Sequence, residues 1–123
     1  MREMSSIYVA VSVGYGLMCL VPAAMKLIGV AKMRDSAEHF GIRWSRYRLV
    51  GVLELAAAVA VFAGIVTPTL GLLAAIGMSA LLIAAVVTHR RAGDGVREYS
   101  SALVFLIASV GYLAVWITAA PRP

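Results

Sequence analysis

Four stretches of almost uninterrupted apolar residues dominate the sequence, and each is about as long as a helix that crosses a membrane. Roughly 20 apolar residues are needed to span the hydrocarbon core of a bilayer. Of the 123 residues, 62% are hydrophobic, against about 45–50% in an ordinary soluble domain. The sequence therefore predicts an all-α integral membrane protein, a single domain over residues 1–123. We expect a four-helix bundle with spans at about residues 7–28, 49–66, 69–87 and 101–119.

The first span follows Met1 and Arg2 and resembles the start of a secretory signal. Its apolar run is longer than the roughly 7–15 residues of a signal peptide's hydrophobic region, so we expect it to be retained. The sequence holds one cysteine, Cys19, which excludes an intramolecular disulfide and a CxxC redox pair.

Basic residues gather beside two of the three connections between the spans. Of the 11 lysines and arginines, nine lie beside the first or the third connection, and only Arg2 and Arg122 lie near the chain ends. Because basic residues favour the cytoplasmic side of a membrane, we expect the first and third connections in the cytoplasm and both termini outside. The charge also indicates membrane lipid with anionic head groups as a partner, whereas nucleic acid is a poor match for so hydrophobic a chain.

The connections themselves differ in length. Pro68 follows the second span closely, and proline suits the first turn of a helix, so the two central spans should form a tight hairpin. The longer first connection mixes charges with aromatic residues, including Trp44 and Tyr47, which is typical of an interfacial segment. We expect a short helix there, from Asp35 to about Gly41.

Small residues recur at every fourth position in both central spans. This spacing lets helices approach closely in lipid, and it predicts close packing against a neighbouring helix of this chain or of a second copy. The residues are Ala56, Ala60 and Gly64 in one span and Gly71, Ala75 and Ser79 in the next.

Polar and aromatic residues follow one face of the first span and one face of the fourth. Polar groups in a membrane bundle turn inward to find partners. Two interpretations are open: hydrogen bonds and aromatic packing between helices, or a ligand pocket lined by Tyr15, Ser12, Ser109 and Tyr112. The two faces consist of Tyr8, Ser12, Tyr15, Cys19, Pro22 and Lys26, and of Ser101, Phe105, Ser109, Tyr112 and Trp116.

One carboxylate interrupts the second span. Glu54 lies about 7–8 Å along the helix from Leu49, where facing lipid would cost about 2.5–3.5 kcal/mol. Lys26 and His89 end the first and third spans and should lie at the same level. Gly51, on the same face as Glu54, leaves room for a helix or a ligand. The pattern supports either a structural ion pair with Lys26 or a site that binds a head group or transfers a proton. No spacing typical of a metal or haem site occurs, so we expect neither a metal nor a covalently bound cofactor.

Several segments resemble the DoxX-like family of small four-helix bacterial membrane proteins. The similar segments are "PAAMKLIG", "AEHFGI", "VGVLELAAAVAVF" and "GLLAAIGMSALLIAAVVTHRRAGD", within roughly residues 10–115. The most specific marks fall on Lys26, Phe40, Gly41, Gly51, Glu54 and His89. The chain departs from the family in having Pro22 and Ala23 where an Ala-Gly pair is frequent.

The resemblance implies a bacterial cytoplasmic (inner) membrane protein with a redox association. The founding member of the family is a subunit of a quinone-linked sulfur oxidoreductase, and relatives belong to membrane oxidoreductase or maturation systems. A quinone or other small lipid-soluble ligand is therefore the implied cofactor, with partner redox subunits or a homo-oligomer as the implied assembly.

Three functions follow from these observations. The first is a subunit or accessory of a quinone-linked system, in which Glu54 accepts a ring hydroxyl or its proton and Lys26 holds the charge. The second is a stand-alone enzyme of isomerase or cyclase type, with Glu54 as general acid or base and Tyr15 and Tyr112 shaping the cavity. The third is a structural or assembly protein in which Lys26 and Glu54 clamp two helices together.

Overall fold

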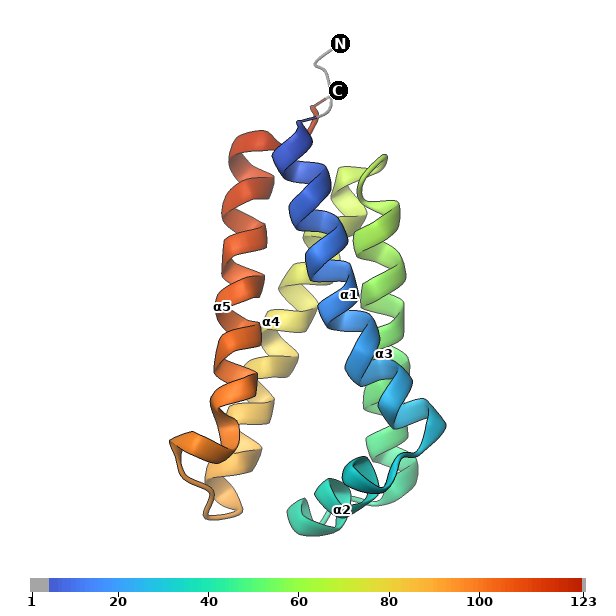
Figure 1. Ribbon diagram of the computed structural model, residues 1–123, viewed down its shortest axis with the longest axis vertical. Coiled ribbons are helices and arrows are strands. Elements are labelled where there is room, and N and C mark those ends of the chain that lie inside the picture. The colour runs from blue at the N-terminus through green and yellow to red at the C-terminus, as the bar shows by residue number, and fades with distance from the viewer. Residues whose placement is uncertain (1–4, 123) are drawn as a thin grey trace.

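The described residues fold into five helices, four of them long (Figure 1). The computed structural model describes residues 5–122, and no strand occurs in that range. The short helix α2 (Ala31–Phe40) lies across one end of the bundle. The long helices are α1 (Ser6–Ile28), α3 (Trp44–Ala63), α4 (Pro68–Arg91) and α5 (Val96–Ala119).

The four long helices form a closed ring in which each packs on two antiparallel neighbours (Figure 1). Helices α1 and α4 run in one direction, and each contacts both α3 and α5, which run in the other direction. The first turn of α1 and the last turn of α5 therefore lie at the same end. The predicted hairpin of the two central spans is confirmed, with Pro68 as the first residue of α4.

Three of the described helices, α1, α4 and α5, are long and apolar enough to cross a membrane. Helix α3 is not among them because its 20 residues include Arg46, Arg48 and Glu54. The predicted all-helical membrane fold thus agrees with the structure, whereas the fourth span stays a prediction.

The expected interfacial helix is present, but it begins four residues earlier than Asp35. Gly29 ends α1 in the left-handed conformation (φ 83°), and Val30 is extended, so a new helix starts at Ala31. Its end is as predicted, because Gly41 (φ 68°) closes α2. Trp44 and Tyr47 belong to the first turn of α3 instead of a separate interfacial segment.

Small residues bring α3 and α4 together near the end of the bundle that holds the hairpin. A Cβ at Gly64 would lie only 2.7 Å from the backbone nitrogen of Gly71. Ala75 is completely buried. Ala56 and Ala60 instead line an outward-facing groove of about 650 Å³ between the same two helices, so the prediction of close packing holds for only part of the pattern.

The buried face of α1 follows the predicted spacing with one exception, whereas on α5 Ser109 and Tyr112 are buried as predicted and Phe105 and Trp116 are only partly buried. Ala23 is buried in place of Pro22, whose side chain is only half-buried. Ala102 is buried in place of Ser101, which is exposed at the start of α5. The other predicted residues of the α1 face, from Tyr8 to Lys26, are buried.

Candidate functional site

An ion pair joins α1 to α3 inside the bundle. Nζ of Lys26, in the last turn of α1, lies 2.8 Å from Oε1 of Glu54 on α3. The topology of the chain predicted this partner for Glu54. The side chains expose only 10% and 7% of their surfaces, so each charge depends on the other for most of its electrostatic stabilisation.

A glycine sets the distance between the two helices at this level. A Cβ at Gly51, one turn before Glu54, would lie 2.8 Å from Cβ of Lys26 and 3.4 Å from the carbonyl oxygen of Ala23. The close approach is thus provided by Gly51 on α3, opposite the position where α1 departs from the family pattern. The ring of Tyr47 lies 5.3 Å from Nζ of Lys26, within reach of a cation–π interaction.

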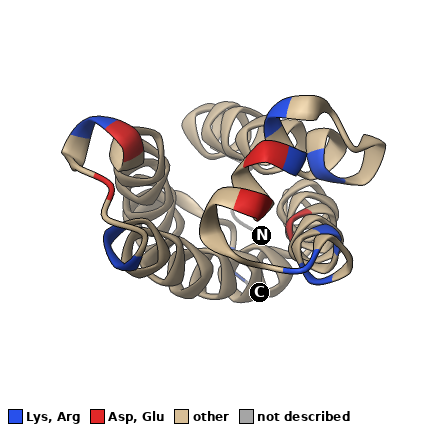
Figure 2. Cartoon of the chain, turned by 90° about the horizontal axis from the view of Figure 1, so that it is seen from below, with Lys and Arg blue, Asp and Glu red and all other residues tan. Residues whose placement is uncertain are grey.

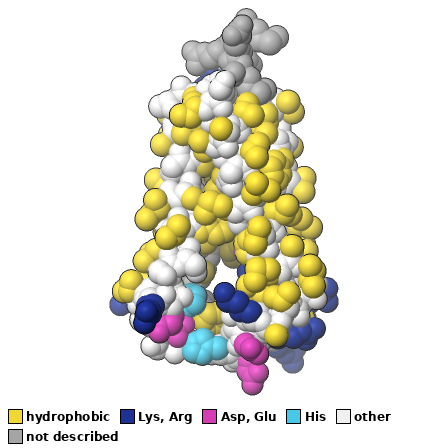
Figure 3. Space-filling view, in the orientation of Figure 1, with side chains coloured by type: hydrophobic (Ala, Val, Ile, Leu, Met, Phe, Trp, Pro, Cys, Tyr) yellow, Lys and Arg dark blue, Asp and Glu magenta, His cyan; other side chains and the backbone are white. Residues whose placement is uncertain are grey.

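The bundle is tightly packed at one end and hollowed at the other. Figure 3 shows a hollow in the lower half of the molecule, with basic and histidine side chains around its lower edge. No described residue of α4 beyond Leu82 is buried, and Ala102 is the single buried residue of α5 before Ser109. The Lys26–Glu54 pair lies in the less tightly packed half.

Hydroxyl groups fill the core of the tightly packed half. Tyr15 and Ser109 are joined by a hydrogen bond of 2.6 Å, and Ser109 also contacts the hydroxyl of Ser79 at 2.8 Å. The rings of Tyr15 and Tyr112 stack with centroids 4.9 Å apart. The hydroxyls of Ser12 and Tyr112 are buried without a hydrogen-bond partner among the described residues. Four of the five predicted ligand-binding residues therefore lie close together, with Tyr15 and Ser109 bonded to each other, whereas the fifth, Gly51, lies beside Lys26.

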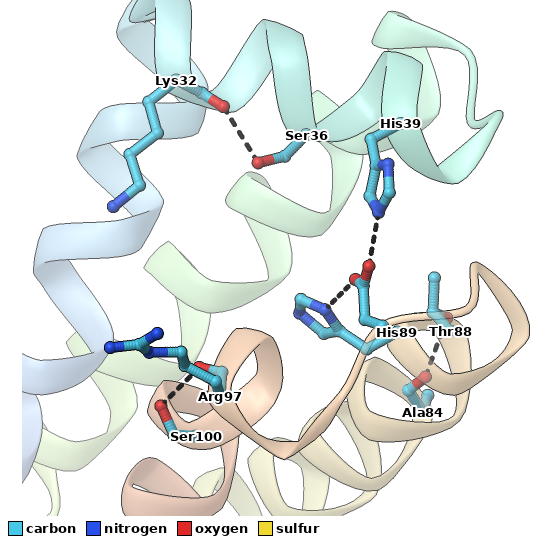
Figure 4. A network of polar contacts seen from close by, with 9 residues as sticks. Lys32, Ser36, His39, Ala84, Thr88, His89, Arg97 and Ser100 are labelled. Atoms are coloured by element: carbon cyan, nitrogen blue, oxygen red, sulfur yellow. Dashed lines mark hydrogen bonds and ion pairs between the residues drawn. The ribbon is translucent and has the colours of Figure 1, made fainter.

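His89 lies apart from the ion pair, in a second polar cluster. Its Nδ1 is 2.7 Å from Oδ2 of Asp94, while Nε2 of His39 is 2.8 Å from the other oxygen of the same carboxylate (Figure 4). The ring of Phe40 packs edge-on against His89 with centroids 4.8 Å apart. These contacts tie α2 to the α4–α5 turn. The structure thus brings Lys26 and Glu54 together but places His89 with Asp94.

Sequence reasoning overlooked the role of Asp94. The signal was present, since Asp94 follows His89 by five residues and Gly93 turns the chain back between them (φ 83°). Hydrogen bonds to His89 and then to His39 hold the pKa of Asp94 below its ordinary value. An acidic residue just after a glycine turn can form a hydrogen bond with a residue in the last turn of the preceding helix.

The Asp94 contacts predict a stability that depends on acid pH. Because the pKa is lowered on folding, the stabilisation is fully present above the ordinary aspartate pKa of 3.8 and is lost as the pH falls through the lower folded value. We expect thermal melts in detergent to show a steeper loss of stability below about pH 4 in the wild type than in Asp94→Asn. Asp35→Asn, an exposed change on α2, is the control. Equal slopes in wild type and Asp94→Asn would contradict this interpretation.

Residues able to hold a metal do not converge: within residues 5–122 no three His, Cys, Asp or Glu side chains are placed to bind one ion. The sequence model of one protein family, described as the DoxX-like family, matches residues 10–112, which is most of the chain. No curated protein and no solved structure matches the chain significantly.

Proposed function

The chain belongs to the DoxX-like family, and from that premise we propose that it is a four-span membrane protein that binds a lipid-soluble molecule at Lys26 and Glu54. The molecule is a quinone or a similar amphiphile, and the protein acts as a subunit or accessory of a quinone-linked redox system in a bacterial inner membrane.

The fourth span in this proposal is α3, which lies antiparallel to α1 and α4 along the same bundle. Its arginines, Arg46 and Arg48, fall in the first two turns, at the end where α2 and most other charged residues gather (Figure 2). After Leu49 its one charge is Glu54, which Lys26 neutralises. With that end in the cytoplasm both termini lie outside, and a cysteine introduced at Thr69 should be labelled from the outside only. Arg2, part of the charge argument for this orientation, lies outside the described residues.

The observation that carries the binding proposal is a buried ion pair that keeps unused hydrogen-bonding capacity and some accessible surface. An ammonium has three N–H donors and a carboxylate about four acceptor positions, and the single short contact between Lys26 and Glu54 uses only part of this capacity. The side chains keep 10% and 7% of their surfaces accessible, in the hollowed half of the bundle (Figure 3). Intramembrane charges of this kind commonly mark ligand or proton pathways.

The chemistry of the pair suits a head group with both hydrogen-bond acceptors and donors. Lys26 donates to a ring carbonyl, and Glu54 accepts the hydrogen of a ring hydroxyl or its proton. A quinone supplies two-electron redox chemistry when bound. The part of the protein is to orient the ring, to keep water away from it and to hold a proton at Glu54.

A second candidate function is the structural clamp, which the 2.8 Å distance favours. In that case the pair fixes α1 against α3 and binds nothing else. The enzyme alternative has no comparable support, because Tyr15 and Tyr112 stack on each other instead of lining a free cavity.

Mass spectrometry of lipid-soluble molecules that co-purify with the protein distinguishes the two candidates. We expect a quinone or similar amphiphile to be enriched with the wild type and absent from a folded Lys26→Met/Glu54→Gln double variant. An added decyl-substituted benzoquinone should likewise bind only the wild type. Lys32→Met, an exposed change on α2, is the matched control and should retain the ligand. Equal ligand content in the wild type and the double variant would leave the clamp as the function of the pair.

A further inference from the structure

A separate pocket, which neither Lys26 nor Glu54 lines, lies where α2 meets the end of α4. It has a volume of about 500 Å³ and is formed by the end of α2 with the residues after it and by the last turn of α4. Figure 4 shows His39 on α2 and Thr88 on α4 on opposite sides of this region. The side chains that matter for its chemistry are Glu38, His39, Phe40, Ile42, Thr88 and Arg91.

Opposite charges line this pocket without neutralising each other. Glu38 and Arg91 are both exposed and form no ion pair, either with one another or with any other residue of the described range. His39 is not free to compensate Glu38, because its Nε2 is already bonded to Asp94. A ligand that carries an anionic and a cationic group would satisfy both walls of the pocket at once.

The position of the pocket indicates the kind of ligand. The apolar part of α4 ends at Val87, and the polar run from Thr88 to Arg91 follows it, so this turn lies where lipid head groups meet hydrocarbon in the proposed membrane orientation. Phe40 and Ile42 give the pocket apolar walls beside its charged ones. A phospholipid presents the same combination, with a charged head next to an apolar glycerol and acyl region.

We propose that this pocket binds the head group of a zwitterionic phospholipid that carries a primary ammonium, with the phosphate at Arg91 and the ammonium at Glu38. The ammonium has three N–H donors, enough to bond Glu38 and also the hydroxyl oxygen of Thr88, whose own hydrogen is donated to the carbonyl of Ala84. A quaternary ammonium has no N–H donor and needs an aromatic cage, whereas the pocket offers one ring, Phe40, already packed on His89. An anionic head group without an ammonium would leave Glu38 unpaired and repelled.

The proposal does not depend on the function of Lys26 and Glu54, since neither residue lines this pocket. It is tested on the full chain in detergent by native mass spectrometry with phosphatidylethanolamine, phosphatidylcholine and phosphatidylglycerol supplied at equal concentration. We expect phosphatidylethanolamine to bind with the highest affinity. Arg91→Gln should weaken that binding about tenfold, the effect of losing one charge-assisted hydrogen bond. Glu38→Gln should abolish the preference over phosphatidylglycerol.

Two control variants keep this test specific. Arg90→Gln changes the neighbouring basic residue, which does not line the pocket, and Asp35→Asn changes an exposed acid on the same helix as Glu38; both should bind phosphatidylethanolamine like the wild type. Equal binding of phosphatidylethanolamine and phosphatidylcholine would overturn the proposal. So would an Arg90→Gln effect as large as that of Arg91→Gln, since it would indicate a diffuse basic surface, or a preference for phosphatidylglycerol in the wild type.

Discussion

Replacing Lys26 by methionine, or Glu54 by glutamine, is expected to lower the free energy of unfolding by about 3–5 kcal/mol. Each change removes one partner of a buried ion pair and leaves the other without its counter-charge. The Lys26 and Glu54 side chains are at least nine-tenths buried and only 2.8 Å apart, so water replaces little of the lost interaction. Equilibrium unfolding in mixed micelles measures the effect.

The double variant Lys26→Met/Glu54→Gln should recover much of that loss, because an uncharged pair of similar volume carries no desolvation penalty. Lys32→Met, which removes an exposed lysine, should leave the unfolding free energy unchanged. Additive losses in the double variant would show that the two side chains act independently. A folded double variant also allows ligand binding to be measured in the absence of the charges of Lys26 and Glu54.

The second large effect is expected at the contact between α3 and α4. Gly64→Ala should destabilise the protein by about 1–3 kcal/mol, because the new Cβ would lie 2.7 Å and 2.8 Å from backbone atoms of Gly71. A backbone cannot rotate away as a side chain does, so the helices must separate. The carbonyl of Gly64 also accepts the hydroxyl hydrogen of Tyr8 at 2.5 Å, and this bond weakens as α3 moves.

Gly77→Ala is the matched control for this effect. Gly77 lies on α4, but a Cβ there would meet nothing within 4 Å, and alanine is favoured over glycine in a helix by about 1 kcal/mol. We therefore expect Gly77→Ala to be neutral or stabilising. Thermal melts of both variants under one detergent condition compare them directly, and equal destabilisation would refute the assignment of Gly64 to a close helix contact.

The helices and their inner faces could be predicted from the sequence because hydrophobic length and helical spacing are local properties. The stripe from Tyr8 to Lys26 on α1 is an example. Its one wrong residue is Pro22, which is half-buried, while the next residue, Ala23, is buried. The pairing of Lys26 with Glu54 followed from topology, since consecutive antiparallel spans place both residues at one level.

Other features depend on contacts between distant segments and could not be predicted in the same way. His89 was expected beside Glu54, but Asp94 is closer in sequence and holds its Nδ1. His39 joins the same carboxylate only because α2 folds back across the end of the bundle. The number of membrane spans could not be predicted with the same certainty for a similar reason. Helix α3 carries three charges, and the free-energy cost of placing them in a membrane depends on the partners that they find in the fold.

The uneven packing of the ring gives the bundle the form of a cup instead of a tube. Tyr8, Ser12, Tyr15 and Tyr112 close its base, and the bond from Trp116 to the carbonyl of Pro68 ties α5 to α4 on the same side. The interior of the bundle is therefore accessible from one end only. If Lys26 and Glu54 bind a ligand as proposed, that molecule would enter and leave at the end of the bundle that holds α2, and would exchange with one side of the membrane instead of crossing it.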